Sequence, residues 1–524
     1  MKPDMRYHLT TFGCQMNEAD TQRLASELEK LGMQATGTRE DADVLVLNTC
    51  VVRQGAEDKA LSFLHYIKPL KQLKPDMVVG VMGCLVGVRG NTPLRKAFPW
   101  IDVFMAPSEP APMVDFLLQR EGQALAAEET RQRFALQDGE YADGALADGA
   151  MRLPARERNH RIAMHVPIVL GCSHACAFCI IPAKRGAERS RPMAEIVTEV
   201  ESLVAQGVRE ITLLGQIVDR YGYDLLGETY AIRKFNPGAA SGVPSQALPV
   251  KTPMVELLQR LNDIPGLLRI RFLTSHPNWM TDELLDAVRE LPKVMPQIEV
   301  PVQAGDDEVL ANMRRGYTRD QYRALIQRIR EKVPNAGIAT DIIVGFCGET
   351  EAQYRQTYDL LEALKLDVIH IAKYSTRPGT PAARNLIDDV TEEDKERRYR
   401  ELEAQQARIT AEINARYEGQ VVQILIDDQH KGKWRGRTPN NKLVFIDDGM
   451  AGDGPDLRGQ LVDVKIGWAG PWSMQGTLVG LSPVGTLLIG SSTSSSTSTL
   501  VPNIFDLQAG EPQHDSEFIP LSTL

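Results

Sequence analysis

Short apolar, β-rich runs alternate with amphipathic helical patterns over the first 120 residues. In chain order, the predicted strands and helices are Tyr7–Thr11, Glu18–Leu31, Asp43–Leu47, Gly55–Leu73 and Met77–Met82. Strands that alternate with helices form βαβ units, whose strands lie parallel in one sheet. The pattern therefore predicts an N-terminal α/β domain with a parallel sheet over residues 5–122.

The same alternation resumes in residues 157–390. The predicted strands are 165–170, 209–214, 268–274, 297–302, 337–345 and 367–374. The predicted helices after the first five strands are 193–206, 253–262, 281–290, 319–332 and 350–364. Repeated βα units close into a barrel or a partial barrel, so we expect a partial (β/α)6 barrel in an α/β protein.

The other segments have distinct compositions. Residues 123–156 are rich in Ala, Gly and Asp and indicate a linker, and residues 225–252 indicate an insertion in one βα loop. Residues 391–416 predict a helical connector, and the short alternating runs of 417–482 predict a small β-barrel. The Ser/Thr-rich tail 483–524 is of low complexity, and we expect disorder there.

The charge of the chain at first argues against a nucleic-acid partner. The 524 residues carry a net charge of −10, but 123–150 and 484–524 each carry −4, so the rest is nearly neutral. A near-neutral body can carry basic patches. No run of eighteen apolar residues and no apolar signal region is present, so we expect a cytoplasmic monomer with no membrane partner.

Three cysteines, Cys172, Cys176 and Cys179, have the spacing C-x3-C-x2-C and form the first trio. They follow the first strand of the central domain, at the end where barrel sites lie. A cubane iron–sulfur cluster has four irons, so three thiolates leave one iron open to a small molecule. The alternative is a structural zinc site with His174 as a cramped fourth ligand.

Cys14, Cys50 and Cys84 form the second trio, and each follows a predicted strand. The carboxyl ends of parallel strands share one edge of the sheet, where ligands commonly bind, so these cysteines can converge. Gly13 and Gly83 precede two of them and would let the backbone approach a bulky cluster. The alternative is three buried cysteines that act as small apolar residues.

The motif around the first trio is similar to that of the radical S-adenosylmethionine (SAM) superfamily. The run 178–182, Arg185-Gly186 and the run 190–192 narrow the resemblance to the methylthiotransferases of the MiaB type. The stretch 11–18, Asn48-Thr49-Cys50 with Arg53, and Gly83-Cys84 resemble the N-terminal domain of that family. The resemblance implies two [4Fe-4S] clusters, with SAM on the open iron of the first and the inserted sulfur on the second.

Further contacts are implied by the same resemblance. Gly215 and Gln216 follow the second barrel strand, where the SAM amino group usually binds, although Gly215 also suits a turn. Gln303 and Arg315 are candidate SAM or substrate contacts, and Arg315 could equally be a surface arginine. The family usually has a different residue at three positions of this chain, which are Ile217, Asp219 and Cys347. We interpret Cys347 as an incidental free thiol.

A basic run lies in the C-terminal β-rich segment. Its candidate RNA-binding residues are Lys431, Lys433, Trp434, Arg435 and Arg437. Basic side chains would meet phosphates, and the tryptophan could stack on a base. The run resembles the TRAM domain, an RNA-binding β-barrel, and the alternative is a solvated basic hairpin.

The resemblance implies methylthiolation of carbon 2 of N6-isopentenyladenosine beside the anticodon of tRNA. That C–H bond is not acidic, so a general base cannot open it and a radical can. An electron donor and a sulfur source would be further partners. The alternatives are the same chemistry on threonylcarbamoyl-adenosine, methylthiolation of a ribosomal-protein aspartate, and a non-catalytic RNA-binding zinc protein. The motif at Gln303 and the run 436–438 favour isopentenyladenosine.

Overall fold

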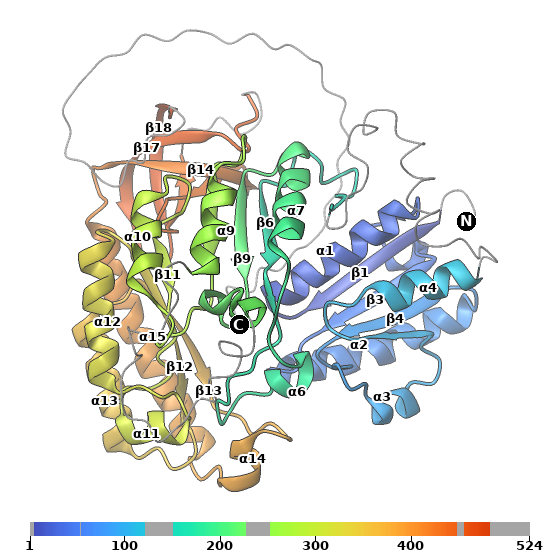
Figure 1. Cartoon of the computed structure of the whole chain (residues 1–524), viewed down its shortest axis with the longest axis horizontal. Coiled ribbons are helices and arrows are strands. Elements are labelled where there is room, and N and C mark those ends of the chain that lie inside the picture. Colours follow the sequence, from blue (N-terminus) through green and yellow to red (C-terminus); the bar gives the residue numbers. More distant parts are fainter. Residues whose placement is uncertain (1–4, 53, 121–149, 227–251, 448–454, 483–524) are drawn as a thin grey trace.

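The computed structural model describes residues 5–52, 54–120, 150–226, 252–447 and 455–482 of the chain. Figure 1 shows an α/β unit at the N-terminus (blue), a central unit of strands covered by helices, and a small C-terminal β-barrel (red). This arrangement confirms the predicted fold class. Most of the predicted linker, most of the predicted insertion, the predicted tail and Arg53 lie outside the described residues.

The N-terminal unit is a parallel sheet with the strand order β2-β1-β3-β4-β5. Its strands are β1 Arg6–Phe12, β2 Gln34–Ala35, β3 Val44–Thr49, β4 Val78–Gly83 and β5 Val103–Met105. Its helices are α1 Gln15–Lys30, α2 Gln54–Leu73, α3 Thr92–Ala97 and α4 Ala111–Arg120. Every residue of β3 and β4 is buried, as expected for central strands of a parallel sheet that helices cover on both faces.

The central unit holds six parallel strands in two adjacent sheets of three, ordered β6-β9-β10 and β11-β12-β13. The strands are β6 Ala163–Pro167, β9 Glu210–Leu214, β10 Arg269–Phe272, β11 Gln297–Glu299, β12 Gly337–Val344 and β13 Val368–Lys373. The covering helices are α7 Met193–Ala205, α9 Pro253–Asn262, α10 Asp282–Glu290, α12 Arg319–Lys332 and α13 Glu351–Leu364. The predicted partial barrel of six βα strands is confirmed.

Two predicted strands are too long. The strand predicted at 165–170 ends at Pro167, and β7 (Val169–Leu170) turns away to pair with β8 (Arg189–Ser190), beyond the first trio. The strand predicted at 297–302 ends at Glu299 because Pro301 has no N–H for the ladder. Each strand therefore ends a few residues before a candidate ligand, Cys172 in the first case and Gln303 in the second.

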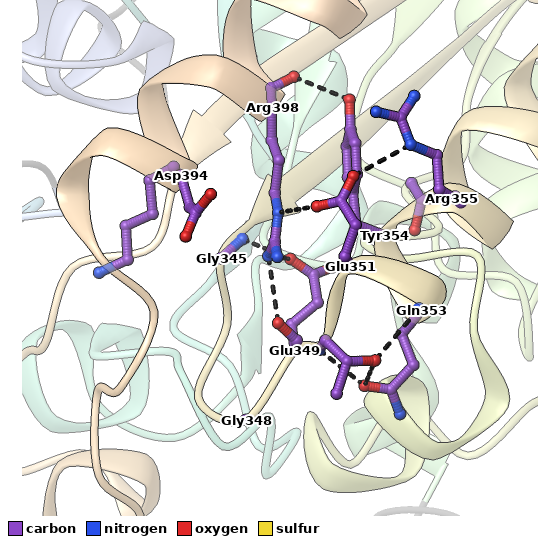
Figure 2. Close-up of polar contacts among 12 residues, drawn as sticks. Gly345, Gly348, Glu349, Glu351, Gln353, Tyr354, Arg355, Asp394 and Arg398 are labelled. Atoms are coloured by element: carbon purple, nitrogen blue, oxygen red, sulfur yellow. Dashed lines mark hydrogen bonds and ion pairs between the residues drawn. The ribbon is translucent and has the colours of Figure 1, made fainter.

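Helix α15 (Glu392–Ala415) packs along the central unit against β12, β13 and α13. Figure 2 shows the contacts that fix it to the loop after β12. Arg398 donates to the Glu349 carboxylate at 2.8 Å, and the same carboxylate accepts the Gly345 N–H at 2.6 Å. Cys347 is buried within the loop that these bonds close.

The C-terminal unit is a closed barrel with the strand order β14-β15-β16-β18-β17. Its strands are β14 Val421–His430, β15 Lys433–Arg437, β16 Leu443–Ile446, β17 Leu461–Ala469 and β18 Met474–Leu481. Arg271 attaches this barrel to the central unit, since its guanidinium donates to the carbonyls of Pro439 at 2.8 Å and Thr438 at 3.0 Å. Among the described residues, none of the helices combines the length and the apolar character that a membrane span requires.

Candidate active site

The first trio lies in the loop between β7 and helix α6 (Ile181–Arg185). Cys172 and Cys176 are buried and Cys179 is half-buried. The loop is closed where the Cys172 N–H donates to the Gly186 carbonyl at 3.1 Å. Burial raises the pKa of the Cys172 and Cys179 thiols to about 12. Because metals bind thiolates, an adjacent positive charge or a metal is needed to deprotonate such thiols near neutral pH.

Arg315 supplies a positive charge at the first trio. Its Nη1 donates to the Sγ of Cys176 at 3.2 Å, and its Nη2 donates to the Pro301 carbonyl at 3.0 Å. Its Nε donates to the Tyr317 hydroxyl at 2.8 Å. The surface-arginine alternative is therefore wrong, because the side chain is buried against a cysteine.

Two histidine rings face each other at the first trio: His174 lies within its loop, and His276, which the sequence did not single out, packs against it. The His174 Nδ1 is 3.3 Å from the Sγ of Cys176, and its ring centroid is 4.4 Å from that of His276. Burial lowers the pKa of His174 to about 3, so the ring is neutral at physiological pH. The His276 N–H donates to the Asp219 carboxylate at 3.1 Å. Asp219, which departs from the family, thus holds the loop of His276.

The zinc alternative would need His174 as a ligand together with the cysteines. Across the described parts of the chain, no three His, Cys, Asp or Glu side chains are grouped closely enough to hold a metal ion, and this applies to both cysteine trios as well as to a zinc site with His174.

The predicted SAM contacts lie at the carboxyl ends of β9 and β11. Gly215 is closely packed, since a Cβ there would lie 3.1 Å from the Val218 Cα. Gln216 beside it is half-buried. Gln303 has a left-handed φ of 79° and is held by backbone bonds with Asp341 at 2.9 Å and Ile343 at 3.0 Å. Such strain persists only where the surroundings hold it, and it commonly marks functional positions.

The second trio converges at the carboxyl edge of the N-terminal sheet. Cys14 precedes α1 and is exposed, whereas Cys50 and Cys84 follow β3 and β4 and are buried. Hydrogen bonds with the Cys50 thiol lower the pKa of Cys14 and of Cys84, and the same contacts raise the pKa of Cys50. Three cysteines far apart in sequence therefore meet side chain to side chain, as their positions after parallel strands predicted.

Backbone and amide contacts hold the second trio together. The Asn17 amide donates to Asn48 Oδ1 and to the Thr49 carbonyl, both at 2.9 Å. The Cys84 N–H donates to the same carbonyl at 2.9 Å. Gly83 has a φ of 99°, and a Cβ there would lie 2.5 Å from the Thr49 oxygen. A side chain at this position would push apart two of the three ligand loops.

The donor sets fit iron–sulfur clusters. Each trio offers three thiols, and cysteine sulfur is the ligand that such clusters use, whereas Mg²⁺ and Ca²⁺ need oxygen ligands. Each trio also has a buried arginine: Arg315 donates to the Sγ of Cys176, and Arg185, after the hydrogen bond with Cys50, is a further cause that lowers the pKa of Cys84. The importance of Arg185 was not foreseen, because only the folded chain brings it to the second trio.

The basic run lies in the turn after β14 and on β15, and the structure changes the role of its tryptophan. Trp434 is only 6% exposed and packs in the barrel core, which leaves no free ring face for a base. The prediction that Trp434 stacks on a base is therefore wrong. Arg435 pairs bidentately with Asp428, and Lys433 pairs with Asp447 at 2.6 Å, while Lys431 is exposed.

Three family models match the chain. They are described as the "Radical SAM superfamily" over residues 166–361, "Uncharacterized protein family UPF0004" over 6–106, and the "TRAM domain" over 415–479. The matches cover the central unit, the N-terminal sheet and the C-terminal barrel in turn.

Similar curated proteins extend over nearly the whole chain. A tRNA-2-methylthio-N(6)-dimethylallyladenosine synthase of Roseiflexus sp. is 44% identical over 91% of this chain and 90% of the relative. A protein of the same name from Chloroflexus aurantiacus is 43% identical over 90% of this chain and 91% of the relative. Among solved structures, the radical SAM methyltransferase TsrM from Kitasatospora setae has 16% identity and a TM-score of 0.48, covering 72% of this chain and 75% of that one.

Proposed function

We propose that the two cysteine trios have different roles in one reaction. This chain belongs to the tRNA-2-methylthio-N(6)-dimethylallyladenosine synthase family. The chain adds a methylthio group to carbon 2 of N6-dimethylallyladenosine, also called N6-isopentenyladenosine, beside the anticodon of tRNA. The family membership follows from relatives that match the chain along 90% of its length, all three units included.

The observation that carries the division is that two complete cysteine trios stand on different units. The first trio would hold the radical-generating [4Fe-4S] cluster and the second an auxiliary [4Fe-4S] cluster. When bound, these groups supply the electron that cleaves SAM and the site that carries the inserted sulfur. The target C–H bond is not acidic, so the reaction needs this radical chemistry.

The residues of the chain bind and orient. Arg315 holds Cys176 and places a fixed positive charge beside the first trio. Gly215, Gln216 and Gln303 follow the carboxyl ends of β9 and β11, the end of the barrel at which the loop of the first trio also leaves β6. We assign them to SAM or to the target nucleoside. Their positions at the carboxyl end of a βα barrel support this assignment.

The C-terminal barrel would bind tRNA through the exposed ends of Lys431 and Lys433 and through Arg435 and Arg437. These side chains lie on one hairpin of a TRAM-like barrel, and such positive charges meet phosphates. An electron donor and a sulfur source are required partners. We place the reaction in the cytoplasm with a monomeric enzyme.

The test uses the full chain, reconstituted anaerobically with iron and sulfide, with SAM, a reductant and tRNA that carries isopentenyladenosine. The expected result is a 2-methylthio product in the nucleosides, read by mass spectrometry. If 5′-deoxyadenosine forms from SAM without that product, the radical chemistry stands and the substrate is wrong. A colourless, iron-free protein would overturn the proposal.

A further inference from the structure

Arg185 belongs to the central unit but ends inside the N-terminal unit. It closes helix α6, six residues after Cys179. Its Nη2 donates to the Asp20 carboxylate at 3.0 Å, and its Nη1 donates to the Ser108 hydroxyl at 3.3 Å. That hydroxyl in turn donates to Asp20 at 2.6 Å. The side chains of Arg185 and Asp20 are 2% and 0% exposed, so this ion pair between the units is buried.

Helix α6 packs against the second trio, because Ile180 at its N-terminus lies in the same apolar cluster as Cys84. After the hydrogen bonds with Cys50, the positive charge of Arg185 is a further cause that lowers the pKa of Cys84 and of Cys14. The neighbouring backbone brings the same two units together, because the Val88 N–H donates to the Lys184 carbonyl at 3.0 Å.

One donor of Arg185 lacks a partner. Its Nε is buried and has no acceptor among the described residues. A buried donor without a partner destabilises the fold, so this N–H is available to an acceptor that the described residues do not supply. An anionic group at the second trio would accept this hydrogen bond. Cluster potentials depend on net charge, on hydrogen bonds to sulfur and on solvent exposure, and Arg185 contributes a buried positive charge beside this trio.

We propose that Arg185 is a positioning residue that sets the reduction potential of the auxiliary cluster at Cys14, Cys50 and Cys84. Its guanidinium stabilises the reduced, more negative form, and Asp20 limits that effect. This inference rests on the proposed two-cluster function. It also gives a role to the side chain of Arg185, which belongs to the central unit but is buried in the N-terminal unit, where the second trio lies.

The test isolates the auxiliary cluster in the full chain with Cys172, Cys176 and Cys179 changed to alanine. After anaerobic reconstitution, a redox titration followed by EPR gives the midpoint potential. In this background, Arg185→Gln should lower the reduced-to-oxidised ratio at a fixed potential about tenfold, which is about 59 mV for one electron. Asp20→Asn should shift the ratio in the opposite direction, and the double variant should return toward the background.

Matched variants separate charge from damage. Arg185→Lys keeps the positive charge. Its ratio should therefore stay within about threefold of the background ratio, well short of the roughly tenfold change expected for Arg185→Gln. Shifts of Arg185→Gln and Asp20→Asn in the same direction, or no shift in either with full iron content, would overturn the inference. If Arg185→Gln holds no iron, the sign of the Asp20→Asn shift still decides. A background protein without iron would instead refute the second cluster of the proposed function.

Discussion

The two cysteine trios reach similar chemistry by opposite routes. The first is local: three cysteines within eight residues, in one loop that leaves the barrel after β7. The second is dispersed: Cys14, Cys50 and Cys84 follow three different strands and meet only when the sheet forms. Each has one buried arginine at a cysteine, but Arg315 is held by a carbonyl and a tyrosine, whereas Arg185 is held by a carboxylate. The local trio is thus fixed by its loop, and the dispersed one by the fold.

Changing either cysteine trio to alanine should have the largest effect on iron content and shows whether the two sites are independent. The reconstituted wild-type chain should hold about eight irons, and each trio variant about four, since the trios stand on separate units. Iron and sulfide analysis after anaerobic reconstitution measures this. A variant of the first trio that loses all iron would show that the two sites do not load independently.

Removing the charge at the first trio should impair SAM cleavage and leave the second trio intact. Arg315→Gln loses a charge-assisted hydrogen bond to Cys176, which is worth about 1.5–3 kcal/mol. We expect the rate of 5′-deoxyadenosine formation to fall about 10- to 100-fold. Arg315→Lys serves as the matched control, and an unchanged rate in the glutamine variant would contradict the assigned role.

Substitution of one glycine beside each trio tests whether the first and the second trio can be disturbed separately. Gly83→Ala would place a Cβ against the Thr49 carbonyl, and Gly171→Ala would place one 2.7 Å from the Gly186 carbonyl; both residues have positive φ. Each change should cost about 1–3 kcal/mol of stability. Gly83→Ala should reduce iron only at the second trio and Gly171→Ala only at the first. Equal losses at both trios would mean that the units are not independent.

Lysine substitutions on the C-terminal hairpin should have the smallest effect and spare both trios. Lys431→Gln and Lys433→Gln should each reduce the salt dependence of tRNA binding by about one unit of slope, with iron content unchanged. Binding measured over a series of salt concentrations tests this. Trp434→Ala, in contrast, should lower stability by about 3–5 kcal/mol, because it leaves a cavity in the barrel core. A folded Trp434→Ala protein with weakened tRNA binding alone would restore the stacking role.

The sequence was sufficient for the alternation of strands and helices, for the three units and for both trios. These follow from local patterns, namely the strand-then-cysteine repeat at Cys14, Cys50 and Cys84 and the spacing of the first trio. It was not sufficient for Arg185, Asp20 and Trp434. Their roles depend on contacts between distant segments, such as the 165 residues that separate Asp20 from Arg185. Local periodicity also missed the strand end at Glu299, which Pro301 imposes.

We propose that the cluster at the first trio generates the radical and that the cluster at the second trio provides the sulfur. One assay measures 5′-deoxyadenosine and the 2-methylthio nucleoside together, with tRNA that carries isopentenyladenosine, for the wild-type chain and both trio variants. The Cys14/Cys50/Cys84→Ala variant should still form 5′-deoxyadenosine but no methylthio product, and the Cys172/Cys176/Cys179→Ala variant should form neither. A methylthio product from the variant without the second trio would refute this division of roles.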